Sequence, residues 1–152
     1  MQDNFVKFST QILSLEKIWH KLAAQEMDNY GLNSSHLSYL LELYNNIDGL
    51  SSYELSTGTT KDKSDVSRSL NFMIKQNIVE KTSVHKRGYA GKYHLTKKGI
   101  EIAEKVSRKV DFAVKYANEG IDEKEKEIFY RVLETFTDNI KALNENQKFY
   151  QE

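Results

Sequence analysis

Five polar residues recur between positions 63 and 71 at a spacing that suits a helix. They are Lys63, Ser64, Ser67, Arg68 and Asn71. In a helix these positions share one face, because residues three and four apart lie above one another. Val66, Leu70 and Met73 fall on the opposite face and supply apolar side chains for a core. The sequence therefore predicts a helix that buries one side and presents a guanidinium, an amide and hydroxyl groups on the other.

These side chains are the ones that recognise base edges in double-stranded DNA. Arginine can donate two hydrogen bonds to N7 and O6 of guanine, and asparagine pairs similarly with adenine. A good bidentate contact is worth roughly 1–3 kcal/mol of discrimination between bases. Arg68 is thus the candidate base reader, in a helix that would enter the major groove by its N-terminal part. The alternative is that Arg68 is only a structural ion-pair partner.

A second set of cations lies in a loop that contains two glycines, at positions 85–92. β-forming residues at 78–84 and 93–96 flank this loop, which predicts a β-hairpin with a basic tip. No acidic residue occurs between positions 81 and 98. Lys86, Arg87 and Lys92 are therefore candidates for contacts with phosphates or the minor groove. An ordinary solvated hairpin is the alternative.

Helices that would position these groups are marked by their caps. An apolar stripe from Phe5 to Leu22 predicts a helix over about 3–30, ended by Gly31. Asn33 or Ser34 is expected to cap the next helix. Ser51 and Glu54 form a predicted capping box for a short helix, and Asp62 caps the helix that carries Arg68 and ends towards Asn77.

Two more helices follow the hairpin, one over about 96–118 and ended by Gly120, the other capped by Asp122. The last helix has the apolar stripe Ile128, Phe129, Val132, Leu133, Phe136 and Ile140. The predicted fold class is mainly α with a small β-hairpin. Its centre is a winged helix-turn-helix, flanked by N- and C-terminal helices whose stripes are suited to dimerisation.

Composition narrows the classes of function. The 22 basic and 22 acidic residues cancel, which excludes a uniformly basic nucleic-acid binder, but acidic residues gather at 119–134 and leave the hairpin basic. Without cysteine there are no disulfides or thiolate ligands. No apolar run approaches the ~20 residues that span a bilayer. The chain also lacks a leader-like start, so no membrane partner and a cytoplasmic location are expected.

The chain resembles the MarR family of winged-helix transcriptional regulators over nearly its whole length. The resemblance is carried by five stretches in combination, namely Ser51-Ser-Tyr-Glu-Leu55, Ser64-Asp-Val-Ser-Arg68, Ile78-Val-Glu-Lys81, Leu95-Thr-Lys-Lys-Gly99 and Ile121-Asp-Glu-Lys-Glu125. It implies one domain over 1–152, with dimerisation helices at 1–31 and 100–145 and a DNA-binding part at 32–99. It also implies an obligate homodimer on a pseudo-palindromic site, although the stripes could instead close a monomeric core.

The family's recognition-helix positions fall on Ser64, Ser67 and Arg68. Family members usually carry an Asp-x-Arg motif in the wing, whereas this chain has Arg87-Gly-Tyr89 there. Lys86 and Arg87 are therefore the candidates for wing contacts without the aspartate that normally braces them.

Similar families often bind small aromatic or lipophilic effectors. The side chains expected to line such a pocket are Trp19, His20, Tyr39, Tyr44, Phe112 and Tyr116. Core packing is the alternative for each of them, and the sequence leaves open whether an effector exists.

Metal binding and catalysis find little support. His20 and His36, with Glu16 one turn before His20, suggest a zinc site, but the helix over 96–118 has no histidine to complete a tetrahedral set. We therefore expect no metal and no cofactor, and interpret both histidines as partly buried helix residues. The chain has neither a glycine-flanked nucleophile nor a phosphate-binding glycine loop, so it is not expected to be an enzyme.

The sequence predicts a sequence-specific regulator, expected to be a repressor, that binds double-stranded DNA as a homodimer. Two alternatives from other classes stay open. One is a winged-helix scaffold for protein interactions, and the other is an architectural DNA binder without sequence preference.

Overall fold

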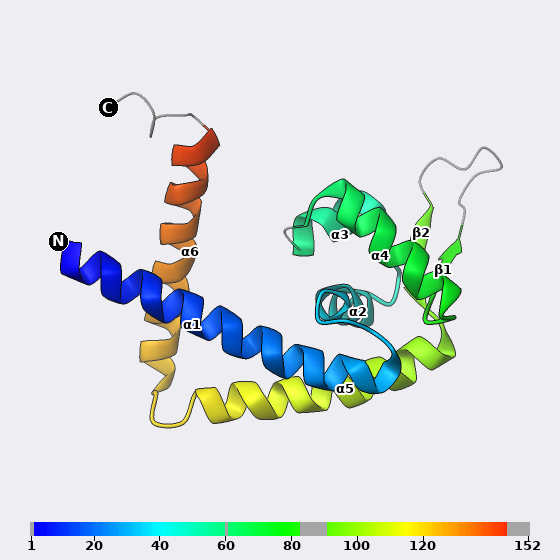
Figure 1. Cartoon of the computed structure of the whole chain (residues 1–152), viewed down its shortest axis with the longest axis horizontal. Helices are drawn as coiled ribbons and strands as arrows, with labels where there is room; N and C mark the ends of the chain where they lie inside the picture. Colours follow the sequence, from blue (N-terminus) through cyan, green and yellow to red (C-terminus); the bar gives the residue numbers. More distant parts are fainter. Residues whose placement is uncertain (1, 60, 83–90, 146–152) are drawn as a thin grey trace. The chain divides into compact units, whose positions relative to one another are not determined.

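The computed structural model describes residues 2–59, 61–82 and 91–145 (Figure 1). The chain forms two compact units, Met1–Val110 and Asp111–Glu152. In chain order the elements are α1 (Gln2–Met27), the 3-10 turn η1 (Asp28–Tyr30), α2 (His36–Asn45), α3 (Ser52–Thr59), α4 (Lys63–Lys75), β1 (Val79–Thr82), β2 (Lys92–Leu95), α5 (Lys97–Ala117) and α6 (Glu123–Glu145). This is the predicted mainly α fold with one hairpin.

The first unit has one hydrophobic core, to which α2, α3, α4, β1 and α5 all contribute. Val66, Leu70 and Met73 point into it from α4, as their spacing predicts. The other buried apolar residues are Met27, Leu32, Tyr39, Leu40, Leu43, Leu55, Ile78, Val79, Leu95, Ile102, Ala103 and Val106. The helices α2, α3 and α4 each contribute apolar side chains to this core. One face of α4 therefore packs against the core, and its opposite face stays exposed.

Local hydrogen bonds start the helices of this unit. The capping box before α3 is confirmed: Ser51 N donates to Glu54 Oε2 at 2.7 Å, and Glu54 N donates to Ser51 Oγ at 3.2 Å. Asn77 has the left-handed φ of 57° expected after α4, and Gly31 ends the first helical stretch with φ 67°.

The predicted cap of α2 is wrong. α2 begins at His36, so Ser35 precedes it in place of Asn33 or Ser34. Asn33 Oδ1 instead accepts hydrogen bonds from Ser35 N at 3.1 Å and Ser35 Oγ at 2.6 Å. Asparagine side chains readily satisfy a turn in this way, which delays the helix by one or two residues.

The wing is an antiparallel pair in which Val79 lies opposite Leu95 and Thr82 opposite Lys92. Leu50 extends it, because Leu50 N donates to Tyr93 O at 3.1 Å and Tyr93 N to Leu50 O at 2.8 Å. The segment that leads into α3 is thereby joined to the wing. Lys86 and Arg87, predicted for the tip, lie outside the described residues.

The second unit contains the end of α5 and α6. A capping box starts α6, with Asp122 N donating to Glu125 Oε2 at 3.0 Å and Glu125 N to Asp122 Oδ1 at 2.9 Å. No residue of α6 is buried, although its apolar stripe includes Ile128, Phe129 and Val132. Among the described residues of both units, no helix has the length and apolarity needed to cross a membrane.

Candidate nucleic-acid interface

The exposed face of α4 carries all five residues predicted for base recognition. Lys63, Ser64, Ser67, Arg68 and Asn71 are exposed to solvent, and Arg68 has 74% of its side chain accessible. In the described part of the chain, Lys63, Ser67 and Asn71 have neither a hydrogen-bond nor an ionic side-chain partner. Their donors are therefore available to another molecule.

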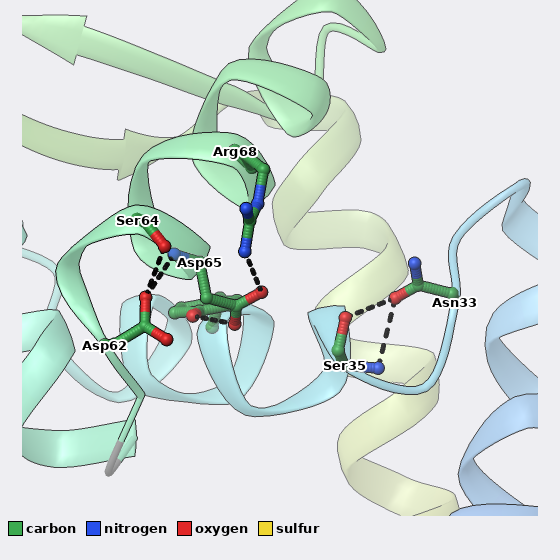
Figure 2. A network of polar contacts seen from close by, with 7 residues as sticks. Asn33, Ser35, Asp62, Ser64, Asp65 and Arg68 are labelled. Carbon is green, nitrogen blue, oxygen red and sulfur yellow. Dashed lines mark hydrogen bonds and ion pairs between the residues drawn. The ribbon is translucent and has the colours of Figure 1, made fainter.

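The first turn of α4 is organised by Asp62, as Figure 2 shows. Asp62 Oδ1 accepts a hydrogen bond from Asp65 N at 2.8 Å and one from Ser64 Oγ at 2.7 Å. These hydrogen bonds, first the one from the Ser64 hydroxyl, hold the pKa of Asp62 below its usual value. The carboxylate therefore stays charged, where the positive end of the helix dipole favours it.

Arg68 is linked through Asp65 to the core. Arg68 Nη2 lies 3.9 Å from Asp65 Oδ1 (Figure 2), and the Tyr39 hydroxyl donates to Asp65 Oδ2 at 2.9 Å. Burial and then the hydrogen bond to Asp65 raise the pKa of Tyr39 to about 12. Tyr39 is thus protonated at neutral pH and remains a donor.

The wing lysines that the structure describes are engaged with the protein. Lys92 Nζ donates to Asp48 O at 3.2 Å, and Lys81 Nζ lies 5.2 Å from the centre of the Tyr93 ring. In the first turn of α5, which follows the hairpin, Lys98 Nζ donates to Gln76 O at 2.9 Å. Lys92, predicted for DNA contact, therefore first serves to tie β2 to the turn before α3.

An open pocket of about 630 Å³ adjoins the exposed face of α4. It is lined by Asp28, Gly31, Leu32, Asn33, Ser35, His36, Asp65, Arg68, Ser69 and Phe72. The rings of His36 and Phe72 stack in its wall with centroids 5.0 Å apart and planes 8° apart. Burial lowers the pKa of His36, and the nearby Asp65 partly opposes this effect.

None of the six side chains predicted for an effector pocket lines this one. Tyr39 is fully buried in the core, while Trp19 and Tyr44 are half-buried. His20 is exposed and its Nδ1 lies 3.2 Å from Ser34 Oγ, so the interpretation of His20 as partly buried is wrong. Phe112 and Tyr116 belong to the second unit and are 71% and 67% exposed.

The metal alternative gains no ligands from the structure. Residues 2–59, 61–82 and 91–145 hold no group of three histidine or acidic side chains placed to bind a metal ion. His20 and Glu16 form a pair at 3.9 Å, whereas His36 is directed to the pocket wall and accepts from Asn33 N at 3.2 Å.

Sequence reasoning missed the role of Asp65 and Tyr39. The sequence assigns no individual role to Asp65, and it places Tyr39 only among the residues of a possible effector pocket. They are 26 positions apart, so no local pattern signals that they meet. The only available hint is an acid three residues before the candidate arginine.

No family model and no curated protein matches the chain. Its likeness to solved structures is extensive. A MarR protein from Peptoclostridium difficile matches with a TM-score of 0.78 at 17% identity, over 89% of this chain and 88% of that one. The S. aureus MepR–DNA complex matches with a TM-score of 0.78 at 16% identity, over 87% and 97%.

A putative MarR-family transcriptional regulator from Listeria monocytogenes, solved with a 26mer DNA, matches with a TM-score of 0.76 at 20% identity, over 86% and 87%. Each of these matches covers between 86% and 97% of both chains. The chain therefore has the winged-helix fold of the MarR-family transcriptional regulators.

Proposed function

We propose that this protein is a transcriptional regulator that binds a specific DNA sequence as a homodimer. The observation that carries the proposal is the exposed face of α4, where Ser67, Arg68 and Asn71 stand on a helix held rigidly from behind by Val66, Leu70 and Met73. Two neighbours of the same fold were solved with DNA, which supports this interpretation of the helix.

The deciding experiment uses an operator obtained by selection from random DNA, with binding measured by fluorescence anisotropy against excess competitor at near-physiological salt. Arg68→Ala should reduce the preference for the operator over competitor by roughly tenfold or more, because one bidentate contact is lost. Arg108→Ala, which removes the same charge from an exposed site on α5, is the matched control and should retain the preference. Equal behaviour of the two variants would show that α4 is not the reading helix.

The wing is proposed to add contacts with the DNA backbone through Lys86 and Arg87. Each phosphate contact adds about 0.9 to the slope of log affinity against log salt. Replacing both residues with alanine should therefore weaken binding to all sequences and make the slope shallower by up to about two. An unchanged slope would exclude the wing from the interface.

The proposal of a homodimer rests on the apolar side chains that each unit exposes. On α1, Phe5, Leu13 and Ile18 are 65%, 65% and 53% exposed, and on α6 Ile128 and Val132 are 53% and 55% exposed. Apolar faces of this length are normally covered by a partner in the native state. A second copy is the partner that also fits the function, since two recognition helices related by a twofold axis read a pseudo-palindromic site.

Release by a small lipophilic or aromatic effector is part of the proposed function, and the pocket beside α4 is the place the geometry supports best. A ligand there would touch Arg68 and Phe72 of α4 and the His36 ring on α2. An effector that binds more tightly to an arrangement of α4 unsuited to DNA would lower the affinity for the operator. The size of this effect is limited by the difference between the effector's affinities for the two arrangements of α4. Compounds found by displacement from the operator should lose their effect when Ser69, a buried pocket residue, is replaced by leucine.

The rival function is a scaffold that binds proteins through its long helices. It predicts no DNA preference at physiological salt in the same assay, and a non-specific architectural binder predicts affinity without preference. Repression is the expected sign of regulation, because a dimer bound over a promoter obstructs transcription.

A further inference from the structure

Asp65 is an acidic residue on the helix that we propose binds DNA. It lies in the first turn of α4, three residues before Arg68, on the helix proposed to approach DNA phosphates. Asp62 already caps this helix and supplies the negative charge that its N-terminus favours. A second carboxylate in this turn weakens the attraction between α4 and DNA phosphates. Its presence is therefore explained best by a role other than capping the helix.

The carboxylate of Asp65 is held by the core. Its Oδ2 accepts the hydroxyl of Tyr39 at 2.9 Å, and the Tyr39 side chain is fully buried on α2. Its backbone N donates to Asp62 at 2.8 Å, which fixes the turn from which the side chain extends. Only 29% of the Asp65 side chain is accessible, so its rotamer is set by protein contacts more than by solvent.

The remaining oxygen faces Arg68. Asp65 Oδ1 lies 3.9 Å from Arg68 Nη2, while Arg68 itself is 74% exposed (Figure 2). An ion pair this exposed contributes little to folding. It does, however, restrict a long side chain that would otherwise sample many rotamers, and restriction before binding reduces the entropy lost on contact.

We infer that Asp65, anchored by the Tyr39 hydroxyl, is a positioning residue that orients Arg68 for base recognition. The inference has two parts, and only the second, that the oriented Arg68 recognises a base, rests on the proposed function. The orientation itself exists in the free protein. Asp65 acts through Arg68 and contacts no base, since its Oδ2 is occupied by Tyr39 and its Oδ1 faces the guanidinium.

The test separates orientation from DNA binding. Asp65→Asn keeps an oxygen that accepts from Tyr39 but removes the charge that attracts Arg68, and Tyr39→Phe removes only the anchoring hydroxyl. NMR relaxation of the Arg68 Nε–Hε group in the free dimer should show larger amplitude motion in both variants than in wild type. Glu101→Gln, which removes an exposed acid from α5, should leave the relaxation of Arg68 unchanged. Unchanged motion in folded Asp65→Asn would overturn the inference whether or not the protein binds DNA.

DNA discrimination gives the second readout, as a double-mutant cycle. Asp65→Asn should reduce the preference for operator over an operator altered at the base that Arg68 reads by about two- to fivefold, the range an exposed ion pair supports. In the Arg68→Ala background the same substitution should have no effect on that preference. If Asp65→Asn had the same effect in the wild-type and Arg68→Ala backgrounds, Asp65 would act on the fold and not through Arg68. If Asp65→Asn changed the base preference of Arg68→Ala, Asp65 would contact a base itself. Loss of sequence preference in wild type would reject the proposed function and leave the relaxation result to decide the orientation of Arg68.

Discussion

The polar residues at the start of α4 divide into those that build the helix and those that stay available. Ser64 donates its hydroxyl to Asp62, and Asp65 accepts from Tyr39, so both are engaged within the protein. Ser67 and Asn71 have no side-chain partner in the described part of the chain, and Arg68 has only its distant ion pair. Among the predicted recognition residues, Lys63, Ser67, Arg68 and Asn71 are therefore the ones available to contact DNA, whereas Ser64 is engaged in the helix cap.

At the residue scale, His36 should make folding stability depend on pH. Burial lowers its pKa from 6.5 in the folded chain, so the unfolded chain takes up this proton first as pH falls. The stability is therefore complete above about pH 6.5 and is lost as the pH falls from there towards the folded pKa. Denaturant unfolding at pH 7.5 and 5.5 should show a smaller loss for His36→Gln than for wild type.

His20 provides the matched control for this effect, because it is a histidine of the same unit with an exposed side chain. His20→Gln should retain the wild-type loss of stability between the two pH values. If His36→Gln and His20→Gln changed the pH dependence equally, the stacked ring of His36 would not be the titrating group responsible.

Among the helices, α5 and α3 each contain a glycine, and the space around the two glycines differs. A Cβ added at Gly99, in the first turn of α5, would lie 2.1 Å from Ile78 O, so glycine allows α5 to begin directly against the backbone of the residue that precedes β1. A Cβ at Gly58 in α3 would meet only the flexible end of Glu42 at 3.3 Å. The first glycine is required by packing, whereas the second only weakens its helix.

These environments predict opposite signs for the same substitution. Gly99→Ala should destabilise the fold by about 1–3 kcal/mol or more, because backbone must move to admit the methyl group. Gly58→Ala should stabilise it by up to about 1 kcal/mol through higher helix propensity. Chemical denaturation of the two variants measures both, and a neutral Gly99→Ala would mean that α5 starts elsewhere relative to β1.

The capping box of α3 offers a second prediction for an element. Ser51→Ala removes the acceptor for Glu54 N and should lower the free energy of unfolding by about 0.5–2 kcal/mol. Ser52 is the neighbouring exposed position and has no side-chain hydrogen bond to any residue that the structure describes, so Ser52→Ala should have little effect. Comparable losses in the two variants would show that the box does not stabilise α3.

For the molecule as a whole, the proposed homodimer depends on the exposed apolar side chains of α1 and α6. Burial of one such side chain is worth roughly 1.5–3 kcal/mol, so several together suffice for stable association. Leu15→Glu on α1 and Ile128→Glu on α6 should each shift the protein towards monomer in analytical ultracentrifugation. They should also weaken operator binding, because both half-sites must be occupied together.

The control for both dimer variants is Lys124→Glu, which introduces the same residue on α6 at an already polar, exposed position. It should sediment as wild type does. A wild-type protein that is monomeric at micromolar concentration would contradict the proposed homodimer, and with it the interpretation of the two stripes.

Local sequence patterns were enough to predict the helices, the hairpin and the exposed face of α4. Caps such as Ser51 with Glu54, and apolar residues repeating every three or four positions, act over a few neighbouring residues and can be recognised locally. The start of α2 was misplaced because Asn33 and Ser35 form a turn whose residue types also suit a helix cap.

The partners of these residues follow from the packing of the helices and could not be predicted from local patterns. Periodicity cannot tell a ring that faces a core from one that lines a cavity, so Tyr39 proved to be core, while the pocket formed around His36 and Phe72. The contact of Tyr39 with Asp65 joins positions 26 apart, and that of Leu50 with Tyr93 joins the wing to α3. Such contacts depend on how helices pack against one another, because the side chains involved are brought together by the whole core and by no local pattern.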